Sequence, residues 1–405
     1  MKLVFVQMMW RHDRSPTATY PKDGVKPDEW RFGGGGLGQL SPKGMEQHMK
    51  LGMELRNRYI DNVYPAFLPS TYKSNAIYVR STDVNRTLIS AYSNMIGLYG
   101  QANYNNSNQY DYPQVAGWPA GLVPVAIHTV RDDTDYLAKK TNEFQAYMNA
   151  TSVQNLFANL TVNCGKKIYF ESIWEPTQAL FSEMIYFNDF RNRTPWYTDE
   201  LYAQMNAVND QEQLFENGIF NKTQLYLDYD IGKQLKILRG GTLLNEISER
   251  FQFKMSCLNK TTDSCNWINN LKAYMYSGHD TILYAFFSAI GVEEYAINPP
   301  GQYPLYSACM ALELWQNTSS GHFYFKLMYH QDEDHDFVEI TQGIPACKNY
   351  PSFCPISILA EVAKDMKPPE PMEKYCFTDL PVSLSTSILS VSTIIYLIFL
   401  GFFLE

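Results

Sequence analysis

Apolar residues along the chain gather in short runs that each end in a cluster of charged residues. The first run covers residues 3–9 and is broken only by Gln7, a pattern typical of a strand buried on both faces. Two further runs, at residues 75–79 and 273–276, pass into helical patterns in the same way. Strand, short loop and helix in this order predict an α/β fold with a doubly wound, mainly parallel sheet.

Three amphipathic helices are expected beside these runs. The first begins after a capping Ser41 with Pro42 in its first turn, and the third covers residues 281–290 and ends at Gly291. Ser81 or Thr82 is expected to cap the second. The expected apolar faces are Met45, Met49, Gly52, Leu55 and Tyr59 in the first helix, and Val84, Leu88, Tyr92 and Met95 in the second.

The middle of the chain differs in composition from its two ends. It is rich in Tyr, Asn and Gln and carries weak strand signals, so we expect a mainly helical cap inserted into the α/β core. Strand patterns return at residues 308–315 and 322–329. The expected division is a core of residues 1–100 and 246–365, a cap of 101–245, a linker of 366–383 and a hydrophobic segment of 384–404.

The last of these segments is a C-terminal stretch of 21 uncharged residues. As a helix it would extend about 31 Å, enough to cross a bilayer. Two interpretations stay open: a terminal transmembrane helix, or a signal that is replaced by a lipid anchor. Either predicts a membrane attachment through the C-terminal tail.

Composition is that of a folded protein of the secretory pathway. The chain is 45% hydrophobic and 19% charged, and its net charge of −9 argues against a nucleic-acid partner. The seven cysteines are dispersed without a C-x-x-C pattern, which favours disulfides over metal or redox roles. Cys257 with Cys265 and Cys347 with Cys354 are the short-range pairs that suggest themselves. Glycosylation is expected at the sequons Asn105, Asn149, Asn159, Asn192, Asn221, Asn259 and Asn317.

These features together predict a membrane-anchored glycoprotein that faces the extracellular space or the lysosomal lumen. Residues 1–10 contain no standard signal peptide, because the apolar stretch is short and leads directly into charged residues. We therefore expect that a signal peptide is missing from this sequence.

Basic residues stand at the ends of all three predicted strands. Arg11, His12 and Arg14 follow the first, Arg80 follows the second, and His279 with Asp280 follows the third; all are candidate site residues. The carboxyl ends of neighbouring parallel strands meet at one edge of a sheet, so these groups are expected to converge. Arginine binds phosphate oxygens in a bidentate manner, and the cluster therefore predicts a phosphate-ester ligand.

A histidine among arginines can attack phosphorus directly as a neutral imidazole. The arginines would stabilise the charge on the phosphoryl oxygens, and Asp280 could protonate the leaving group and later activate water. This scheme requires no metal and no other cofactor.

These motifs resemble those of the histidine acid phosphatases, which include prostatic and lysosomal acid phosphatases. Residues 11–16 are similar to the family signature R-H-G-x-R-x-P, residues 78–87 to its second phosphate-binding segment, and residues 277–282 to its H-D motif. Residues 39–44 are similar to its characteristic early helix start. The resemblance extends from about residue 2 to residue 376.

The resemblance implies a metal-independent acid phosphatase that hydrolyses small phosphate monoesters through a phosphohistidine. It implies His12 as nucleophile, Asp280 as proton donor, and Arg11, Arg14, Arg80 and His279 as phosphate-binding residues. It also implies disulfides Cys164–Cys376 and Cys347–Cys354, and a homodimer, because luminal members are commonly dimers.

One residue is missing from the first motif, where the glycine after the histidine is absent. Counted from the strand, His12 keeps the place of the nucleophile; counted back from Ser15 and Pro16, Arg11 would occupy it, and a one-residue slip reverses side-chain direction. The alternative function is therefore a membrane-anchored pseudophosphatase that binds phosphorylated ligands without hydrolysing them. A cytosolic enzyme similar to phosphoglycerate mutase is disfavoured by the cysteines, sequons and hydrophobic tail.

Overall fold

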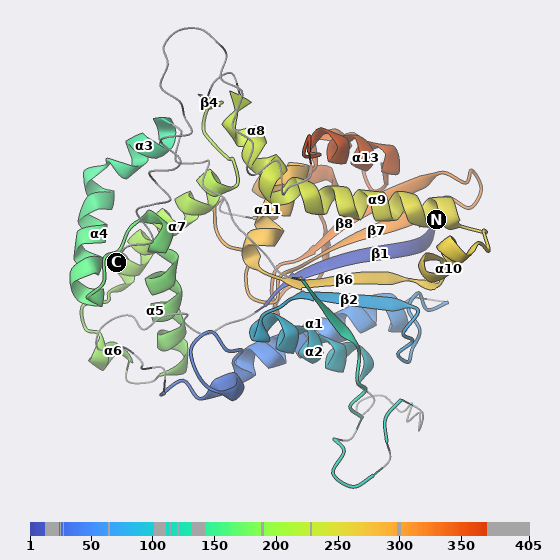
Figure 1. The fold of residues 1–405 in the computed structure, drawn as a ribbon, viewed down its shortest axis with the longest axis horizontal. Helices are drawn as coiled ribbons and strands as arrows, with labels where there is room; N and C mark the ends of the chain where they lie inside the picture. Colours follow the sequence, from blue (N-terminus) through green and yellow to red (C-terminus); the bar gives the residue numbers. More distant parts are fainter. Residues whose placement is uncertain are drawn as a thin grey trace.

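The fold is built on one mixed β-sheet with helices on both faces (Figure 1). The computed structural model describes residues 1–12, 24, 26, 28–63, 65–100, 111–113, 115–119, 121–130, 142–187, 190–226, 229–297 and 301–370. The sheet strands are β1 Lys2–Arg11, β2 Ile77–Thr82, β3 Ile127–Val130, β6 Ala273–Gly278, β7 Cys309–Gln316, β8 Phe323–His330, β9 Val338–Glu339 and β10 Cys354–Pro355.

Four of these strands confirm the predicted parallel arrangement. The sheet order is β10-β8-β7-β1-β6-β2-β3, with β9 paired to β8. The pairs β1–β6, β6–β2 and β2–β3 are parallel, whereas β7 runs antiparallel to β1 and to β8. The predicted strands at residues 308–315 and 322–329 are β7 and β8. The sheet is therefore parallel on one side of β1 and antiparallel on the other.

Helices cover the two faces of the sheet (Figure 1). On one face, Val6, Met8 and Trp10 of β1 pack in a core shared with α1 and α2. On the other face, Phe5 and Met9 pack in a core shared with α9, α11 and α13. Alternate side chains of β1 thus enter opposite cores, as expected of a strand buried on both faces. These helices are α1 Pro42–Arg56, α2 Asn85–Tyr99, α9 Thr242–Cys257, α11 Asp280–Ile290 and α13 Ile356–Asp365.

Helix α1 begins as predicted, and Gly52, Leu55 and Tyr59 of the predicted stripe are buried, but the start of the stripe differs. The Ser41 side chain accepts a hydrogen bond from the Gly44 backbone, which confirms the cap. The buried face includes His48 and Leu51, whereas Met45 and Met49 are only half-buried, so the first half of the stripe was placed wrongly. Burial lowers the pKa of His48 to about 3, so this imidazole is neutral in the folded protein.

Helix α2 corrects two expectations. Ser81 and Thr82 lie in β2 rather than at the helix cap, and Val84 occupies the cap without a side-chain hydrogen bond. Tyr92 is 50% exposed, so it does not belong to the apolar face. Helix α11 matches its prediction, since it ends at Gly291 in a left-handed conformation with φ 78°.

Two glycines allow α1 and α2 to cross at close range. A Cβ atom added to Gly52 would lie 2.0 Å from the Asn94 carbonyl oxygen, and one added to Gly97 would lie 2.0 Å from that of Met49. Both positions exclude any larger residue without separation of the helices.

A second group of helices lies beyond the sheet (Figure 1). We call α3 to α7 the helical lobe: α3 Asn142–Met148, α4 Thr151–Cys164, α5 Trp174–Tyr186, α6 Phe190–Arg193 and α7 Asp199–Glu216. Its separate core is rich in aromatic rings, with Phe170 and Phe215 at its centre. Shorter elements complete the chain: β4 Leu225–Tyr226, β5 Tyr229–Asp230, α8 Ile231–Lys236, α10 Asp263–Asn270 and α12 Glu293–Ala296.

Two of the three expected disulfides are present. Cys257 is joined to Cys265, and Cys347 to Cys354. Cys164 is buried, whereas Cys376 lies outside the described residues, so the third pairing stays a prediction.

The membrane segment predicted at residues 384–404 also lies outside the described residues. Of the helices that the structure does describe, none combines the length and the apolar character needed to cross a bilayer.

Candidate active site

The register of β1 and β6 brings the first and third predicted motifs together. Arg11 lies opposite Gly278, so the next residues, His12 and His279, leave the sheet side by side. His12 Nε2 lies 2.8 Å from His279 Nδ1, and the two rings meet edge to face. His12 is 2% exposed. The buried His12 and the half-buried His279 therefore form a pair at the carboxyl ends of the parallel strands.

Residues after β2 complete this pair. Arg86, in the first turn of α2, donates from Nε to His12 Nε2 at 3.1 Å. Thr82, at the end of β2, lies with its Oγ1 3.1 Å from His279 Nε2. The Ser277 hydroxyl accepts from the Trp10 indole and donates to the Thr87 carbonyl, joining β1, β6 and α2 next to Arg86. The second motif thus contributes an arginine to the histidine pair.

Arg11 forms an ion pair with Asp280, the predicted proton donor. Its Nη2 lies 2.9 Å from Asp280 Oδ2, and only 4% of the arginine side chain is exposed. Its Nη1 donates to the Pro304 carbonyl. Arg11 and His12 after β1 thus lie next to Asp280 and His279 after β6, so two of the three predicted strand ends bring their candidate residues together.

Arg80 does not join this group. It lies two residues before the end of β2, and its Nη2 pairs with Glu246 of α9 at 2.9 Å. Its guanidinium lies over the Tyr276 ring, 4.8 Å from the centroid. The residue of this segment that reaches His12 is Arg86, which sequence reasoning quoted within the motif without assigning it a role. Arg86 lies beyond the end of β2, and this position could have identified it as a site residue.

The structure also bears on the shortened first motif. His12, and not Arg11, faces His279 and Arg86. This is the register counted from the strand, because β1 extends to Arg11 without a shift next to β6. Arg14 lies outside the described residues, so its predicted phosphate contact stays a prediction.

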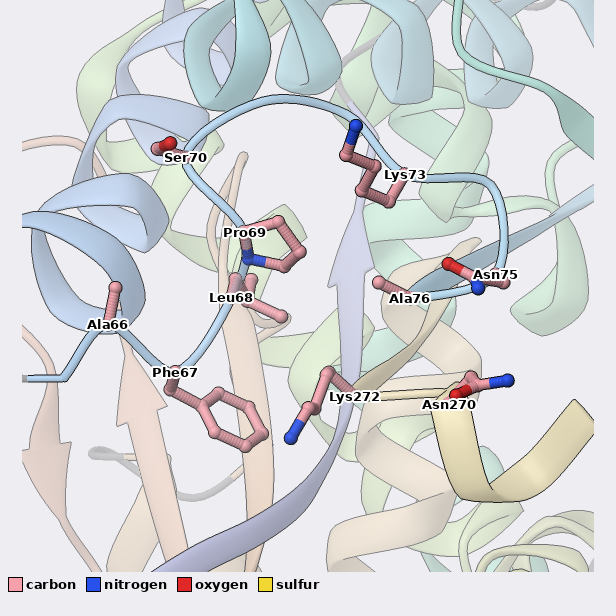
Figure 2. Close-up of a pocket in the computed structure, with 10 residues that line it drawn as sticks. All are labelled: Ala66, Phe67, Leu68, Pro69, Ser70, Lys73, Asn75, Ala76, Asn270 and Lys272. Atoms are coloured by element: carbon pink, nitrogen blue, oxygen red, sulfur yellow. The ribbon is translucent and has the colours of Figure 1, made fainter.

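A separate cavity of about 390 Å³ lies at the other end of β6. Figure 2 shows residues that line this cavity, with Lys73 and Asn75 on the chain before β2 and Asn270 and Lys272 on the chain before β6. Lys272 directly precedes the first residue of β6, whereas His279 directly follows the last. The cavity is therefore remote from the histidine pair.

The fold and the histidine pair define the class of protein. Residues 2–330 match the family described as the histidine phosphatase superfamily, branch 2. The chain therefore belongs to this family.

Relatives cover nearly the whole chain. A Caenorhabditis elegans protein, provisionally named acid phosphatase 10, is 31% identical over 401 residues, which span 93% of this chain and 94% of that protein. Human lysosomal acid phosphatase is 29% identical over 90% of this chain and 78% of its own length. The phytase of Citrobacter braakii has a similar fold, with a TM-score of 0.57 and 16% identity over 93% of this chain and 99% of that one.

Proposed function

We propose that this chain is an acid phosphatase that hydrolyses phosphate monoesters to an alcohol and inorganic phosphate. Membership of the histidine phosphatase family and the acid phosphatase relatives support this activity. The observation that carries it is the contact set of His12 Nε2, which lies 2.8 Å from His279 Nδ1 and 3.1 Å from Arg86 Nε. A nucleophilic nitrogen between cationic or hydrogen-bonding groups suits attack on a phosphoryl group.

In the first half-reaction, His12 Nε2 attacks phosphorus and the bond from phosphorus to the ester oxygen breaks. Asp280, in its protonated form, gives its proton to the departing oxygen, so an alcohol leaves. Arg11, Arg86 and His279 donate N–H groups to the phosphoryl oxygens as charge builds on them. The product of this step is a phosphohistidine at His12.

In the second half-reaction, water attacks the phosphohistidine. Asp280, now a carboxylate, accepts a proton from that water, and the bond from phosphorus to His12 breaks. Inorganic phosphate leaves and the starting protonation is restored. Every group in this scheme is a protein side chain or the substrate itself, so we propose a metal-independent mechanism.

This assignment replaces Arg80 with Arg86 among the phosphate-binding residues. The 2.9 Å ion pair with Glu246 occupies Arg80, whereas Arg86 already reaches the nucleophile. A bidentate arginine next to the nucleophile is the arrangement that phosphoryl transfer favours.

The helical lobe lies next to the strand ends that carry the site (Figure 1), and we infer that it caps the site. Gln178 of α5 and Gln213 of α7 contact Tyr306 and Tyr303, which precede β7. Such a lobe would contact the alcohol part of a substrate and so select among phosphate monoesters.

The setting that we infer is the extracellular space or a lysosomal lumen. Two disulfides fit an oxidising compartment, and a lysosomal acid phosphatase is among the relatives. Among the described sequons, Asn149, Asn159, Asn192, Asn221 and Asn259 are exposed. Glycosylation, membrane anchoring and a homodimer stay predictions.

The test is hydrolysis of p-nitrophenyl phosphate at acidic pH by the full-length chain without added metal. We expect turnover by the wild type and none above background by His12→Ala. Quenching with alkali after labelled substrate should preserve a phosphohistidine, which is stable to base and labile to acid, in Asp280→Asn and not in His12→Ala. A folded wild type without turnover would restore the pseudophosphatase alternative, which the assembled site and the relatives do not favour.

A further inference from the structure

Residues 301–308, which we call the Arg11 loop, contact the Arg11 side chain through two tyrosine rings and one backbone carbonyl. The Arg11 guanidinium carbon lies 4.2 Å from the centroid of the Tyr306 ring and 5.9 Å from that of Tyr303. Between these rings, the Pro304 carbonyl accepts a hydrogen bond from Arg11 Nη1. Cations are held over aromatic rings by the quadrupole of the ring, most strongly where water is excluded. Arg11 is 3% exposed, so the loop fixes a nearly dry guanidinium.

Both tyrosines are also hydrogen-bonded to the helical lobe. The Tyr306 hydroxyl donates to Gln178 Oε1 of α5 at 2.9 Å. Gln213 Nε2 of α7 donates to the Tyr303 hydroxyl at 2.8 Å. Two helices of the lobe thus hold the two rings that contact one arginine of the site.

The start of the loop touches the lobe as well. A Cβ atom added to Gly301 would lie 2.7 Å from the Asp210 carbonyl oxygen of α7, and Gly301 has φ 93°. The Gly301 amide donates to the Tyr284 hydroxyl of α11 at 3.0 Å. The loop is therefore anchored between the lobe and the α/β core at its first residue.

Backbone strain stands directly after Tyr306. Ser307 has φ 60°, a left-handed conformation that is unfavourable for a residue with a Cβ atom. Its side chain is fully buried, and Ser307 Oγ has no hydrogen-bond partner in the part of the chain that the structure describes. If the backbone at Ser307 adopted an ordinary conformation, the Tyr306 side chain would point in another direction. The strain therefore accompanies the placement of the ring over Arg11.

We propose that Tyr306 and Tyr303 are positioning residues through which the helical lobe sets the orientation of Arg11. The proposal rests on the proposed phosphatase function. Arg11 also pairs with Asp280 at 2.9 Å, so a rotated guanidinium would disturb phosphate binding and the proton donor together. A substrate that shifts the lobe would then change turnover as well as affinity. The helical lobe would then influence the reacting groups as well as the choice of substrate.

The experiment is a double-mutant cycle on the full-length chain with Tyr306→Phe, Gln178→Leu and both together. Readouts are kcat and KM for p-nitrophenyl phosphate, the inhibition constant of inorganic phosphate, and the melting temperature. Tyr306→Phe keeps the ring over Arg11 and removes one hydrogen bond, so kcat/KM should fall about three- to tenfold. Gln178→Leu should give a similar loss, and the double variant no more than either alone.

Tyr306→Leu removes the ring and should lower kcat/KM about 30-fold, with weaker inhibition by phosphate. Tyr202→Phe is the matched control, because this hydroxyl belongs to the same lobe but its ring stacks on Phe181. It should leave kcat/KM unchanged.

Two results would overturn the proposal. One is a Tyr306→Leu variant whose kcat/KM and inhibition constant for phosphate stay within twofold of the wild type. The other is a double variant in which the fold-loss of kcat/KM equals the product of the losses in Tyr306→Phe and Gln178→Leu. Should Tyr306→Leu fail to fold, the cycle with Tyr306→Phe still decides. Absence of turnover in the wild type would instead reject the proposed function. Phosphate binding, read from tryptophan fluorescence, would then still report whether Tyr306 positions Arg11.

Discussion

Two arginine-containing clusters lie on the same strands and differ in the partners of their arginines. In the site, Arg86 donates to a histidine nitrogen, His12 Nε2, at 3.1 Å. In the second cluster, which we call the Arg80 network, Glu246 lies between Arg80 at 2.9 Å and Arg250 at 2.5 Å. The Arg250 guanidinium also lies 3.8 Å from the centroid of Tyr274.

The difference separates a structural arginine from a functional one. Arg80 meets a glutamate that is not a site residue, so its charge is balanced within the protein and it holds elements together, whereas the carboxylate that Arg11 meets is the site residue Asp280. The Arg80 network joins α9 to β2 in this way. An arginine that meets the attacking nitrogen can exchange that contact for a phosphoryl oxygen when substrate binds. Motif position alone does not distinguish the two, since both arginines lie in the same ten-residue segment.

The largest expected effect comes from exchanging each arginine for leucine and comparing activities. Arg86→Leu removes a donor from the reacting group and should lower kcat/KM by on the order of 10²- to 10³-fold. Arg80→Leu should keep kcat/KM within about threefold, because Arg80 holds Glu246 and not the site. Steady-state hydrolysis of p-nitrophenyl phosphate measures both. Equal losses in the two variants would contradict the division into two clusters.

The second effect concerns stability and belongs to the Arg80 network. Glu246→Leu leaves Arg80 and Arg250 facing one another in a half-buried place and should lower the free energy of unfolding by about 2–3 kcal/mol. Glu249→Leu, three residues along α9, is the matched control, because its ion pair with Lys367 is 61% exposed on the glutamate side. Its expected cost is below about 0.5 kcal/mol. Urea unfolding at neutral pH measures both, and equal costs would argue against the network.

Sequence reasoning predicted the strand ends better than the contacts between helices. A parallel sheet brings the carboxyl ends of its strands together whatever the side chains, so the meeting of His12, His279 and Asp280 followed from two apolar runs. Arg80 was expected beyond the strand end, but β2 continues to Thr82, so Arg80 lies within the strand and pairs with Glu246 instead. The burial of His48 was not predicted, because the residue pattern within α1 does not show which residues pack over it.

The helical lobe was predictable as a helical region but not as a partner of Arg11. Its helices follow from local pattern, whereas the bonds from Gln178 to Tyr306 and from Gln213 to Tyr303 join residues 128 and 90 positions apart. Contacts at such separation are set by packing of the whole domain.

The third prediction uses the pH dependence of the same glutamate. Burial alone would raise the pKa of Glu246, but hydrogen bonds and charges from Arg80 and Arg250 outweigh it and hold the pKa below its ordinary value of 4.5. A carboxyl whose pKa is lowered by folding stabilises the protein above its unfolded pKa and loses that contribution as pH falls through its folded pKa.

Wild type should therefore exceed Glu246→Gln in unfolding free energy by about 1.5 kcal/mol at pH 7, and the gap should close below pH 4.5. Urea titrations at several pH values measure it. A gap that stays constant into the acid range would show that Glu246 acts through packing and not through its charge.

The smallest expected effect concerns the contribution of Tyr276 to the Arg80 network. The Tyr276 hydroxyl accepts from Arg250 and donates to Glu246 Oε1 at 3.3 Å. Tyr276→Phe keeps the ring beneath Arg80 and should lower the free energy of unfolding by about 1 kcal/mol. Tyr295→Phe, at a tyrosine that is 60% exposed, should change nothing. Tyr276 lies in β6, only three residues before His279. Unchanged kcat/KM in Tyr276→Phe would therefore show that the two clusters are energetically separate although both adjoin this strand. A loss of kcat/KM as large as that of Arg86→Leu would instead show that the site depends on the Arg80 network.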